Sequence, residues 1–277
     1  MDDHPGLAPV EIRRFRNGRL TATDDLTAVE EPLSVRLCSG GRTRTVAITM
    51  RTPGRDADLA RGFLFTEGVL PARARVPCHE PKSNVMVAEP PAAVMIDWER
   101  LNRHSYTSSS CGVCGKTSLE QVYQTLPFPA PLHPLRVPAA LLPELPPKLR
   151  NAQVLFDRTG GIHAAGLFSA AGDLHHFAED VGRHNALDKL IGYAYHQDLL
   201  PLEDHVLVLS GRASFELLQK AGMAGLRIVV AVGAPSSLAV GLARELNITL
   251  CGFTSARGFN CYAGHERLQN SDKLAPE

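Results

Sequence analysis

The chain has 277 residues, and its 29 Lys and Arg side chains balance 29 Asp and Glu side chains. Hydrophobic residues make up 44% and charged residues 21%, which is typical of a globular protein and excludes long intrinsic disorder. The zero net charge argues against wrapping of duplex DNA, and without a long apolar run or an N-terminal signal peptide we expect a soluble protein of the cytoplasm.

The first 106 residues are predicted to form a flexible arm followed by a β-rich subdomain. Residues 1–25 are charged and rich in turn-forming residues, as is typical of a loose N-terminal arm. Over residues 26–106, alternation of apolar and polar side chains predicts strands, and one stretch with helical spacing predicts a helix. In chain order we expect a hairpin of strands at 33–37 and 45–49, a helix at 58–67, and a second strand pair at 85–87 and 94–96.

The rest of the chain changes from a cysteine-bearing loop to alternating strands and helices. Residues 107–126 hold a Cys-x-x-Cys loop and a helix, and the prolines of residues 127–149 predict an extended connector or an irregular helix. Over 150–270, apolar strands alternate with helices, which indicates a covered, mainly parallel sheet and the α/β fold class. We expect strands at 164–168, 174–177, 206–209, 227–231 and 248–250, helices at 181–195, 213–224 and 236–245, and a tail at 271–277.

The strongest chemical signal is the Cys-Gly-Val-Cys-Gly motif at residues 111–115. In a reducing compartment, a close cysteine pair is catalytic or metal-binding rather than a structural disulfide. Nearby helix N–H groups and Lys116 favour the thiolate of Cys111 or Cys114, which could attack a sulfur donor, bind a metal or exchange disulfides. The remaining cysteines are interpreted as buried small hydrophobic residues: Cys38, Cys78, Cys251 and Cys261.

Other interpretations of this cysteine pair have weaker support. A structural zinc site needs about four ligands, and the sequence has no second close pair. A thioredoxin-like dithiol would follow the first strand of a βαβ unit, whereas this motif follows a β-rich region. A zinc deaminase would need a preceding His-x-Glu and a proline before the first cysteine, and serines and glycines make a poor setting for core cysteines. We therefore expect no bound metal.

Polar residues also gather around the predicted strand and helix ends. His163, after Gly160 and Gly161, is interpreted as a proton carrier or ligand-orienting residue, or equally as a hydrogen-bonded core histidine. Two turns that lead from a strand into a helix, at 210–214 and 232–237, are typical sites for phosphorylated ligands. Further polar residues at the start of the helix at 181–195 suit an anion, although a solvated face explains such residues in most helices: Glu179, Arg183, His184, Asn185 and Asp188.

The loop at 252–262 is the last candidate for ligand binding. Arg257 offers a planar fork for phosphate, and Gly258 gives access to the backbone. Phe253, Phe259 and Tyr262 could stack on a flat heterocycle. An equally good interpretation is a C-terminal loop that packs on the core.

Taken together, the motifs resemble the FdhD family of formate dehydrogenase accessory sulfurtransferases. Each motif alone is modest, but their combination and order are specific and extend from Leu33 to Leu268. The motifs that carry the resemblance are Cys-Gly-Val-Cys-Gly, Gly-Gly-Ile-His-Ala-Ala, Glu-Asp-Val-Gly-Arg-His-Asn-Ala-Leu-Asp-Lys, Leu-Ser-Gly-Arg-Ala-Ser-Phe-Glu and Arg-Gly-Phe-Asn-x-Tyr.

The resemblance implies a sulfur carrier with a cytidine-deaminase-like three-layer core that forms a homodimer. Cys111 would carry a persulfide received from a cysteine desulfurase, and Cys114 would assist. The acceptor would be the molybdenum or tungsten bis(molybdopterin guanine dinucleotide) cofactor, abbreviated Mo-bisMGD, which formate dehydrogenase then uses. Residues implied to bind this cofactor are Phe253, Thr254, Ser255, Ala256, Arg257 and Gly258. Arg212, Ser214 and Ser236 would supply further donors.

Two alternatives to the sulfur carrier remain at this point. A non-catalytic chaperone would hold the molybdenum cofactor or the apo-dehydrogenase, tolerate substitution of both cysteines, and lose function when residues 253–258 are changed. A zinc-stabilised binding module would carry a metal that elemental analysis detects.

Overall fold

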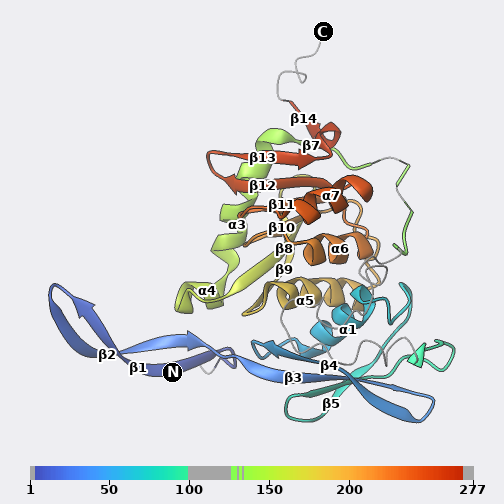
Figure 1. Cartoon of the computed structure of the whole chain (residues 1–277), viewed down its shortest axis with the longest axis horizontal. Coiled ribbons are helices and arrows are strands. Elements are labelled where there is room, and N and C mark those ends of the chain that lie inside the picture. The colour runs from blue at the N-terminus through green and yellow to red at the C-terminus, as the bar shows by residue number, and fades with distance from the viewer. Residues whose placement is uncertain (1–3, 99–125, 130, 133, 271–277) are drawn as a thin grey trace.

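The computed structural model describes residues 4–98, 126–129, 131, 132 and 134–270 of the chain. A six-stranded sheet with helices on both faces lies next to a four-stranded sheet, and a two-stranded hairpin projects to one side (Figure 1). The α/β fold class is therefore confirmed. In this part of the chain, no helix combines the length and apolar character that a membrane crossing requires.

The segment expected to be a loose arm is instead a regular antiparallel hairpin. Strand β1 (Leu7–Arg16) pairs along its whole length with β2 (Arg19–Ala28). The turn between them is Asn17-Gly18, with φ angles of 51° and 76°. Asn-Gly between two strands is the strongest short-range hairpin signal, because both positions need a positive φ. The charged composition of this segment therefore does not prevent strand formation.

The four-stranded sheet has the order β4-β3-β6-β5 and confirms the first predicted hairpin. Its strands are β3 (Glu31–Ser39), β4 (Arg42–Arg51), β5 (Cys78–Lys82) and β6 (Val85–Ala88). The predicted pairing of 85–87 with 94–96 is wrong, because β6 pairs with β5 and β3, and residues 94–96 form no strand. Asn84, with a φ of 61°, makes the tight turn from β5 to β6.

The six-stranded sheet is mixed rather than mainly parallel. Its strands are β8 (His163–Phe168), β9 (Leu174–Asp180), β10 (Val206–Leu209), β11 (Ile228–Ala231), β12 (Thr249–Ser255) and β13 (Gly258–Ala263). Their order is β13-β12-β11-β10-β8-β9, and the parallel neighbours are β10–β11 and β11–β12. The pairs β8–β9 and β12–β13 are hairpins, and their short connections require antiparallel pairing.

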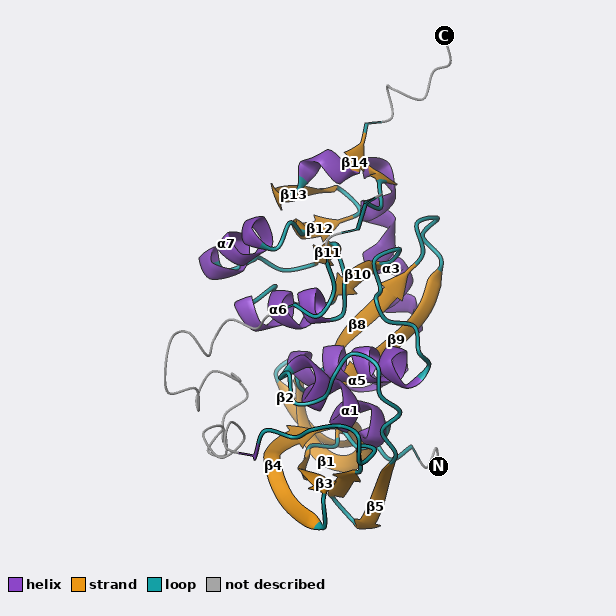
Figure 2. Cartoon of the chain, turned by 90° about the vertical axis from the view of Figure 1, so that its right-hand side faces the viewer, coloured by secondary structure: helices purple, strands orange, loops and turns teal. Residues whose placement is uncertain are grey.

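Helices cover both faces of this sheet, as Figure 2 shows for α6 and α7 on one side and α3 on the other. The first face carries the predicted helices α5 (Arg183–His196), α6 (Phe215–Met223) and α7 (Ser237–Glu245). The second carries the 3₁₀ helix η2 (Ala139–Glu144) and α3 (Leu145–Ala152), which the short α4 (Val154–Thr159) follows. The second half of the proline-rich connector is thus helical from Ala139 onwards, whereas residues 134–138 before it are not, so each predicted alternative holds for part of the segment. Short strands β7 (Val137–Pro138) and β14 (Leu268–Gln269) pair, and the 3₁₀ helix η3 (His265–Arg267) precedes β14.

Alternating side chains of the central strands fill two cores. Leu207 and Val229 belong to the larger core under α5, α6 and α7. Val208 and Val230, one residue further along each strand, belong to the smaller core with Leu145 of α3. Side chains with a period of two reach opposite faces of a sheet, so each strand contributes to both cores.

Helix α1 (Asp56–Thr66) confirms the helix predicted at 58–67 and connects the two sheets. It lies against α5, with the four-stranded sheet on its other side (Figures 1 and 2). The two helices meet at Gly62 and Gly192, where a Cβ on either glycine would collide with backbone of the other helix. Nearby, the buried Lys220 of α6 contacts Asp188 of α5 (2.9 Å) and Thr66 of α1 (2.8 Å). Close packing and buried polar contacts therefore join three helices.

Candidate functional site

The candidate site lies where the three parallel strands end. The loops that follow β10 and β11 are hydrogen-bonded to each other and to the last part of β12. The Gly233 N–H donates to the Gly211 carbonyl (3.0 Å), and the Phe253 N–H donates to the Gly233 carbonyl (3.2 Å). A Cβ on Gly233 would lie 2.9 Å from the Arg212 backbone nitrogen, so this close approach requires glycine. These two loops and the end of β12 form one continuous wall.

This wall borders a cleft of about 770 Å³. Opposite the strand ends, α3 and the segment that follows it supply the other side. Residues that line the cleft include Arg150, Gln153, Gly160, Gly161, His163, Ser210, Thr254, Ser255 and Ala256. Ligand sites at the carboxyl ends of parallel strands are common in α/β proteins, and this volume suits a nucleotide-sized molecule.

Two buried polar groups in the cleft lack hydrogen-bond partners among the described residues. Gln153 and Thr254 are only 2% and 1% exposed, and the Gln153 Nε2 and the Thr254 Oγ1 are unpaired. Leaving a buried donor or acceptor unpaired costs about 1–3 kcal/mol, so such groups are rare without a reason. A ligand with hydrogen-bonding edges would supply the missing partners.

His163 lies between this cleft and a second one. It begins β8, is half-buried, and also lines a cleft of about 460 Å³ together with Arg183, His184 and Asn185. Burial, followed by the positive charge of Arg183 and of His184, lowers the pKa of His163. The imidazole is therefore neutral near pH 7 and can both donate and accept a hydrogen bond.

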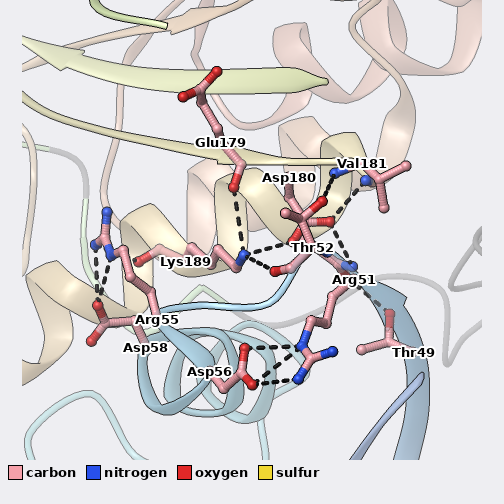
Figure 3. Close-up of polar contacts among 12 residues, drawn as sticks. Thr49, Arg51, Thr52, Arg55, Asp56, Asp58, Glu179, Asp180, Val181 and Lys189 are labelled. Atoms are coloured by element: carbon pink, nitrogen blue, oxygen red, sulfur yellow. Dashed lines mark hydrogen bonds and ion pairs between the residues drawn. The ribbon is translucent and has the colours of Figure 1, made fainter. Parts of the chain in front are cut away.

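Most of the polar residues around the start of α5 hold the fold together. Figure 3 shows the Lys189 ammonium in contact with Asp180 (2.7 Å) and with the Thr52 carbonyl (2.8 Å), while the Thr52 N–H donates to Asp180 (3.2 Å). Glu179 accepts from the N–H groups of Leu155 (3.1 Å) and Phe156 (3.0 Å) in the first turn of α4. These contacts attach the start of α5 to the neighbouring segments.

Two further residues of this segment are buried rather than part of a solvated face. Asn185 donates to the Met50 carbonyl (2.7 Å) and accepts from the Thr49 hydroxyl (3.1 Å). Asp188 is only 1% exposed and forms the buried pair with Lys220. The solvated-face interpretation is therefore wrong for both residues, because α5 lies between the central sheet and α1.

His184 and Arg183 face the second cleft. The His184 Nε2 lies 2.9 Å from Glu216 and 3.2 Å from the Ser214 hydroxyl, so Ser214 has a partner within the fold. The Arg183 Nε is buried and has no partner among the described residues. An anion at the start of α5 remains a prediction for these two side chains.

Three of the residues predicted to bind the cofactor lie in the wall of the large cleft. These are Thr254, Ser255 and Ala256, whereas Phe253, Arg257 and Gly258 are not among the residues that line it. Phe253 has a φ of 53° and is 54% exposed, and Gly258 has a φ of 134° in the turn between β12 and β13. Their role in binding stays a prediction.

The other predicted site residues do not share one location or role. The Ser236 hydroxyl accepts from the Ala239 N–H (3.2 Å) and thus caps α7, and the Arg212 side chain is exposed. Cys111 and Cys114 lie outside the described residues. Within the described ranges, no group of three or more His, Cys, Asp or Glu side chains could hold a metal ion.

Sequence reasoning missed the contribution of α3 and of the segment after it. Gln153 and Arg150 line the cleft from a segment that the sequence marked only as the end of a connector and the start of the next domain. No local motif distinguishes Gln153 from a surface glutamine. Only its burial beside the strand ends reveals it.

Comparison with known proteins gives consistent results over nearly the whole chain. The model of the FdhD/NarQ family matches residues 28–269. The sulfur carrier protein FdhD of Streptomyces coelicolor is 48% identical over 270 residues, covering 93% of this chain and 94% of that protein. Its counterpart in Mycobacterium tuberculosis is 43% identical over 271 residues, covering 93% and 96%.

A solved structure shares the fold. It is the crystal structure of a candidate formate dehydrogenase accessory protein of Desulfotalea psychrophila, which superposes with a TM-score of 0.76 at 22% identity. The match covers 96% of this chain and 100% of the other. Sheets, helices and their order are thus similar in two distantly related sequences.

Proposed function

This chain belongs to the FdhD/NarQ family, and we propose that it is a sulfur carrier for a molybdenum- or tungsten-dependent formate dehydrogenase. Cys111 receives sulfur from a cysteine desulfurase and passes it to Mo-bisMGD, the acceptor substrate. The observation that carries the proposal is the identity of 42–48% to proteins named sulfur carrier protein FdhD over more than nine-tenths of the chain. Location in the cytoplasm and likeness to the cytidine deaminase core remain predictions of the same proposal.

The chemistry needs a nucleophilic thiol that is accessible to a large partner. The Cys111 thiolate attacks the outer sulfur of the desulfurase persulfide, forms a new S–S bond and releases the desulfurase cysteine as a thiolate. Gly112 and Gly115 directly follow the two cysteines, and residues without a side chain leave room for that approach. Cys114, three residues further along the chain, would assist.

The large cleft suits one guanine dinucleotide end of the acceptor. Guanine presents both donors and acceptors along its edge, which complement the unpaired Gln153 amide and Thr254 hydroxyl. Gly160 and Gly161 lie in the cleft wall and allow close approach of a ligand to the backbone. Arg150, also in the wall and now paired with Asp157 (2.6 Å), would turn its guanidinium to a phosphate.

Mass spectrometry of the sulfur-loaded chain tests the carrier role. After incubation with a cysteine desulfurase and cysteine, we expect the tryptic peptide of residues 104–116, which contains both cysteines of the motif, to gain one sulfur atom that a reductant removes. Cys111→Ala should abolish the gain, while Cys38→Ala, a control on β3, should retain it.

The outcomes separate the carrier from its alternatives. A wild-type chain that gains no sulfur beside an active desulfurase contradicts the carrier role and favours a chaperone that only holds the cofactor. Cys111→Ala chains that still sulfurate the cofactor contradict the role of Cys111. Stoichiometric zinc in the purified protein would favour a zinc-stabilised binding module.

The homodimer is also part of the proposal, and the projecting hairpin supports it. Phe15 and Leu20 form a cross-strand pair near the tip of the β1–β2 hairpin and are 68% and 67% exposed. An isolated two-stranded hairpin is marginally stable in water. A second copy of the chain would cover this apolar pair and stabilise the hairpin.

A further inference from the structure

Cys251 and Cys261 face each other across the antiparallel strands β12 and β13. They are direct partners in the strand register, so their side chains lie on the same face of the sheet, and the Cys261 sulfur also contacts the Ala263 carbonyl (3.3 Å). Cys251 is fully buried in the smaller core, as predicted, but Cys261 is exposed, and its interpretation as a buried residue is wrong. Edge strand β13 leaves the Cys261 sulfur open to small solutes.

The two thiols differ in pKa. The hydrogen bond with Cys251 lowers the pKa of the Cys261 thiol to about 7, although partial burial opposes this change. The same hydrogen bond and burial raise the pKa of Cys251. Burial instead raises the pKa of Cys78 to about 11, so the cysteines of the described residues differ strongly in their thiolate content. The lower pKa makes Cys261 the better nucleophile of the two at neutral pH.

The pair also brackets the turn in the cleft wall. Cys251 precedes Phe253 by two residues, and Cys261 follows Gly258 by three, so a bond between them closes a loop that contains residues 253–258. The ladder that holds this turn is irregular, with register shifts between Leu250 and Cys251 and between Gly252 and Ser255. A covalent bond would add a constraint where backbone pairing is interrupted.

We propose that Cys251 and Cys261 are a redox-active dithiol, which a peroxide oxidises to a disulfide that closes a covalent loop around the cleft-lining turn. The Cys261 thiolate attacks a peroxide oxygen, which breaks the O–O bond and forms a sulfenic acid and hydroxide. Cys251 then attacks the Cys261 sulfur, displaces hydroxide and gives up its proton. The two thiols lose two electrons, and hydrogen peroxide is reduced to two molecules of water.

This dithiol is separate from the Cys-x-x-Cys motif, and its chemistry does not depend on the sulfur-carrier function. Peroxide would act on Cys261 whether or not Cys111 carries sulfur. The site is therefore tested by its own covalent product.

A peptide cross-link is the direct test, because trypsin cleaves after Arg257 and so separates the two cysteines. After peroxide treatment of the full chain, we expect the peptides of residues 245–257 and 258–267 to be joined, with the loss of two hydrogens, and to separate again on reduction. Cys261→Ser should abolish the cross-link, and the matched control Cys38→Ser should retain it.

The alkylation rate of Cys261 at pH 7 tests the role of Cys251. Lowering a thiol pKa from about 9 to about 7 raises the thiolate fraction about 50-fold, but the weaker nucleophilicity of the thiolate leaves a net gain of roughly sixfold. Cys251→Ala should therefore slow alkylation of Cys261 about sixfold. Cys251→Ser keeps a hydrogen-bond donor, so its Cys261 should stay reactive while the cross-link is lost.

Either of two results would overturn the inference. One is that the two peptides stay separate while Cys261 alone is oxidised to sulfinic acid. The other is that alkylation of Cys261 is equally fast in Cys251→Ala and in the wild type. Circular dichroism melts show whether each variant is folded. If Cys251→Ala does not fold, Cys251→Ser takes its place in the comparison with the wild type.

Discussion

At the residue scale, one strand contains two buried threonines in opposite situations. Thr249 and Thr254 both belong to β12 and are 0% and 1% exposed. The Thr249 hydroxyl donates to the Gly264 carbonyl (2.6 Å), whereas the Thr254 hydroxyl in the cleft has no partner among the described residues. The comparison separates a hydroxyl that stabilises the fold from one that is available to a ligand.

Replacing each threonine by valine should therefore have opposite effects. Thr254→Val removes an unpaired buried hydroxyl, so stability should be unchanged or higher, while GDP, the probe for the dinucleotide end, should bind about fivefold more weakly for a lost bond of about 1 kcal/mol. Thr249→Val should destabilise the chain by about 1–3 kcal/mol and leave GDP binding intact. Urea unfolding and titration calorimetry measure the two effects. Equal GDP affinity in Thr254→Val and the wild type would contradict this role of Thr254.

A second residue-scale effect concerns pH. The His176 ring stacks on Tyr193 at 3.7 Å between centroids, and burial, followed by the charge of Arg55, lowers the pKa of His176 to about 4. In the unfolded chain the pKa is about 6.5, so between these values the unfolded state binds the proton more readily. The stability contributed by neutral His176 is complete above pH ~6.5 and is lost as the pH falls toward 4.

His176→Phe should remove this dependence while it keeps the ring stacked on Tyr193. Because His176 is half-exposed, solvent screening reduces the expected difference to on the order of 1 kcal/mol. Urea unfolding of the wild type and the variant at pH ~7, ~5.5 and ~4.5 measures this difference in stability. Parallel loss of stability in both proteins would mean that other groups dominate acid unfolding.

At the element scale, the approach of α1 to α5 depends on two glycines. Gly62 and Gly192 leave no space for a Cβ, because backbone of the other helix occupies it. Glycine normally weakens a helix by about 1 kcal/mol relative to alanine, so close packing here offsets an unfavourable propensity. The crossing positions α1 between α5 and the four-stranded sheet.

A matched pair of alanine substitutions distinguishes packing from propensity. Gly62→Ala should destabilise the chain by about 1–3 kcal/mol or more, since backbone cannot move as a flexible side chain would. Gly241→Ala in α7, where nothing lies within 4 Å of the new Cβ, should stabilise it by up to about 1 kcal/mol. Urea unfolding gives both values, and the same sign for the two variants would contradict the packing argument.

At the scale of the whole molecule, the β1–β2 hairpin extends away from the body (Figure 1). Its Asn-Gly turn sets the hairpin register locally, but its exposed apolar pair needs a cover that the local sequence does not supply. The proposed homodimer places that cover in a second copy.

Light scattering tests the dimer. We expect a mass twice the 30.0 kDa of one chain at micromolar concentration, and a lower mass for the double variant Phe15→Ser/Leu20→Ser. Leu238→Ser, which changes an apolar residue of α7 that is 50% exposed, is the control and should remain dimeric. A monomeric wild type, or an unchanged mass in the double variant, contradicts this role of the hairpin.

Most helices and strands of residues 163–250 could be predicted from the sequence because their periodicity is local, whereas the loop expected at 252–262 is instead the end of β12 and strand β13. Strand β10 at Val206–Leu209 has the predicted bounds, and α7 at Ser237–Glu245 differs by one residue from the prediction. The order of motifs along the chain was also sufficient to indicate the family, which the family model confirms over residues 28–269. Neither conclusion requires knowledge of which distant segments meet.

Only the tertiary structure decided which segments pair and which polar groups are buried. It placed β5, rather than residues 94–96, beside β6, buried Asp188 against Lys220, and brought Gln153 to the cleft. It also set Cys251 opposite Cys261. Periodicity encodes which face of an element is apolar, but the partner of that face depends on packing between residues far apart in the chain. For this reason the sequence by itself determined the family and most elements of residues 163–250, and the fold determined the cleft and the cysteine pair.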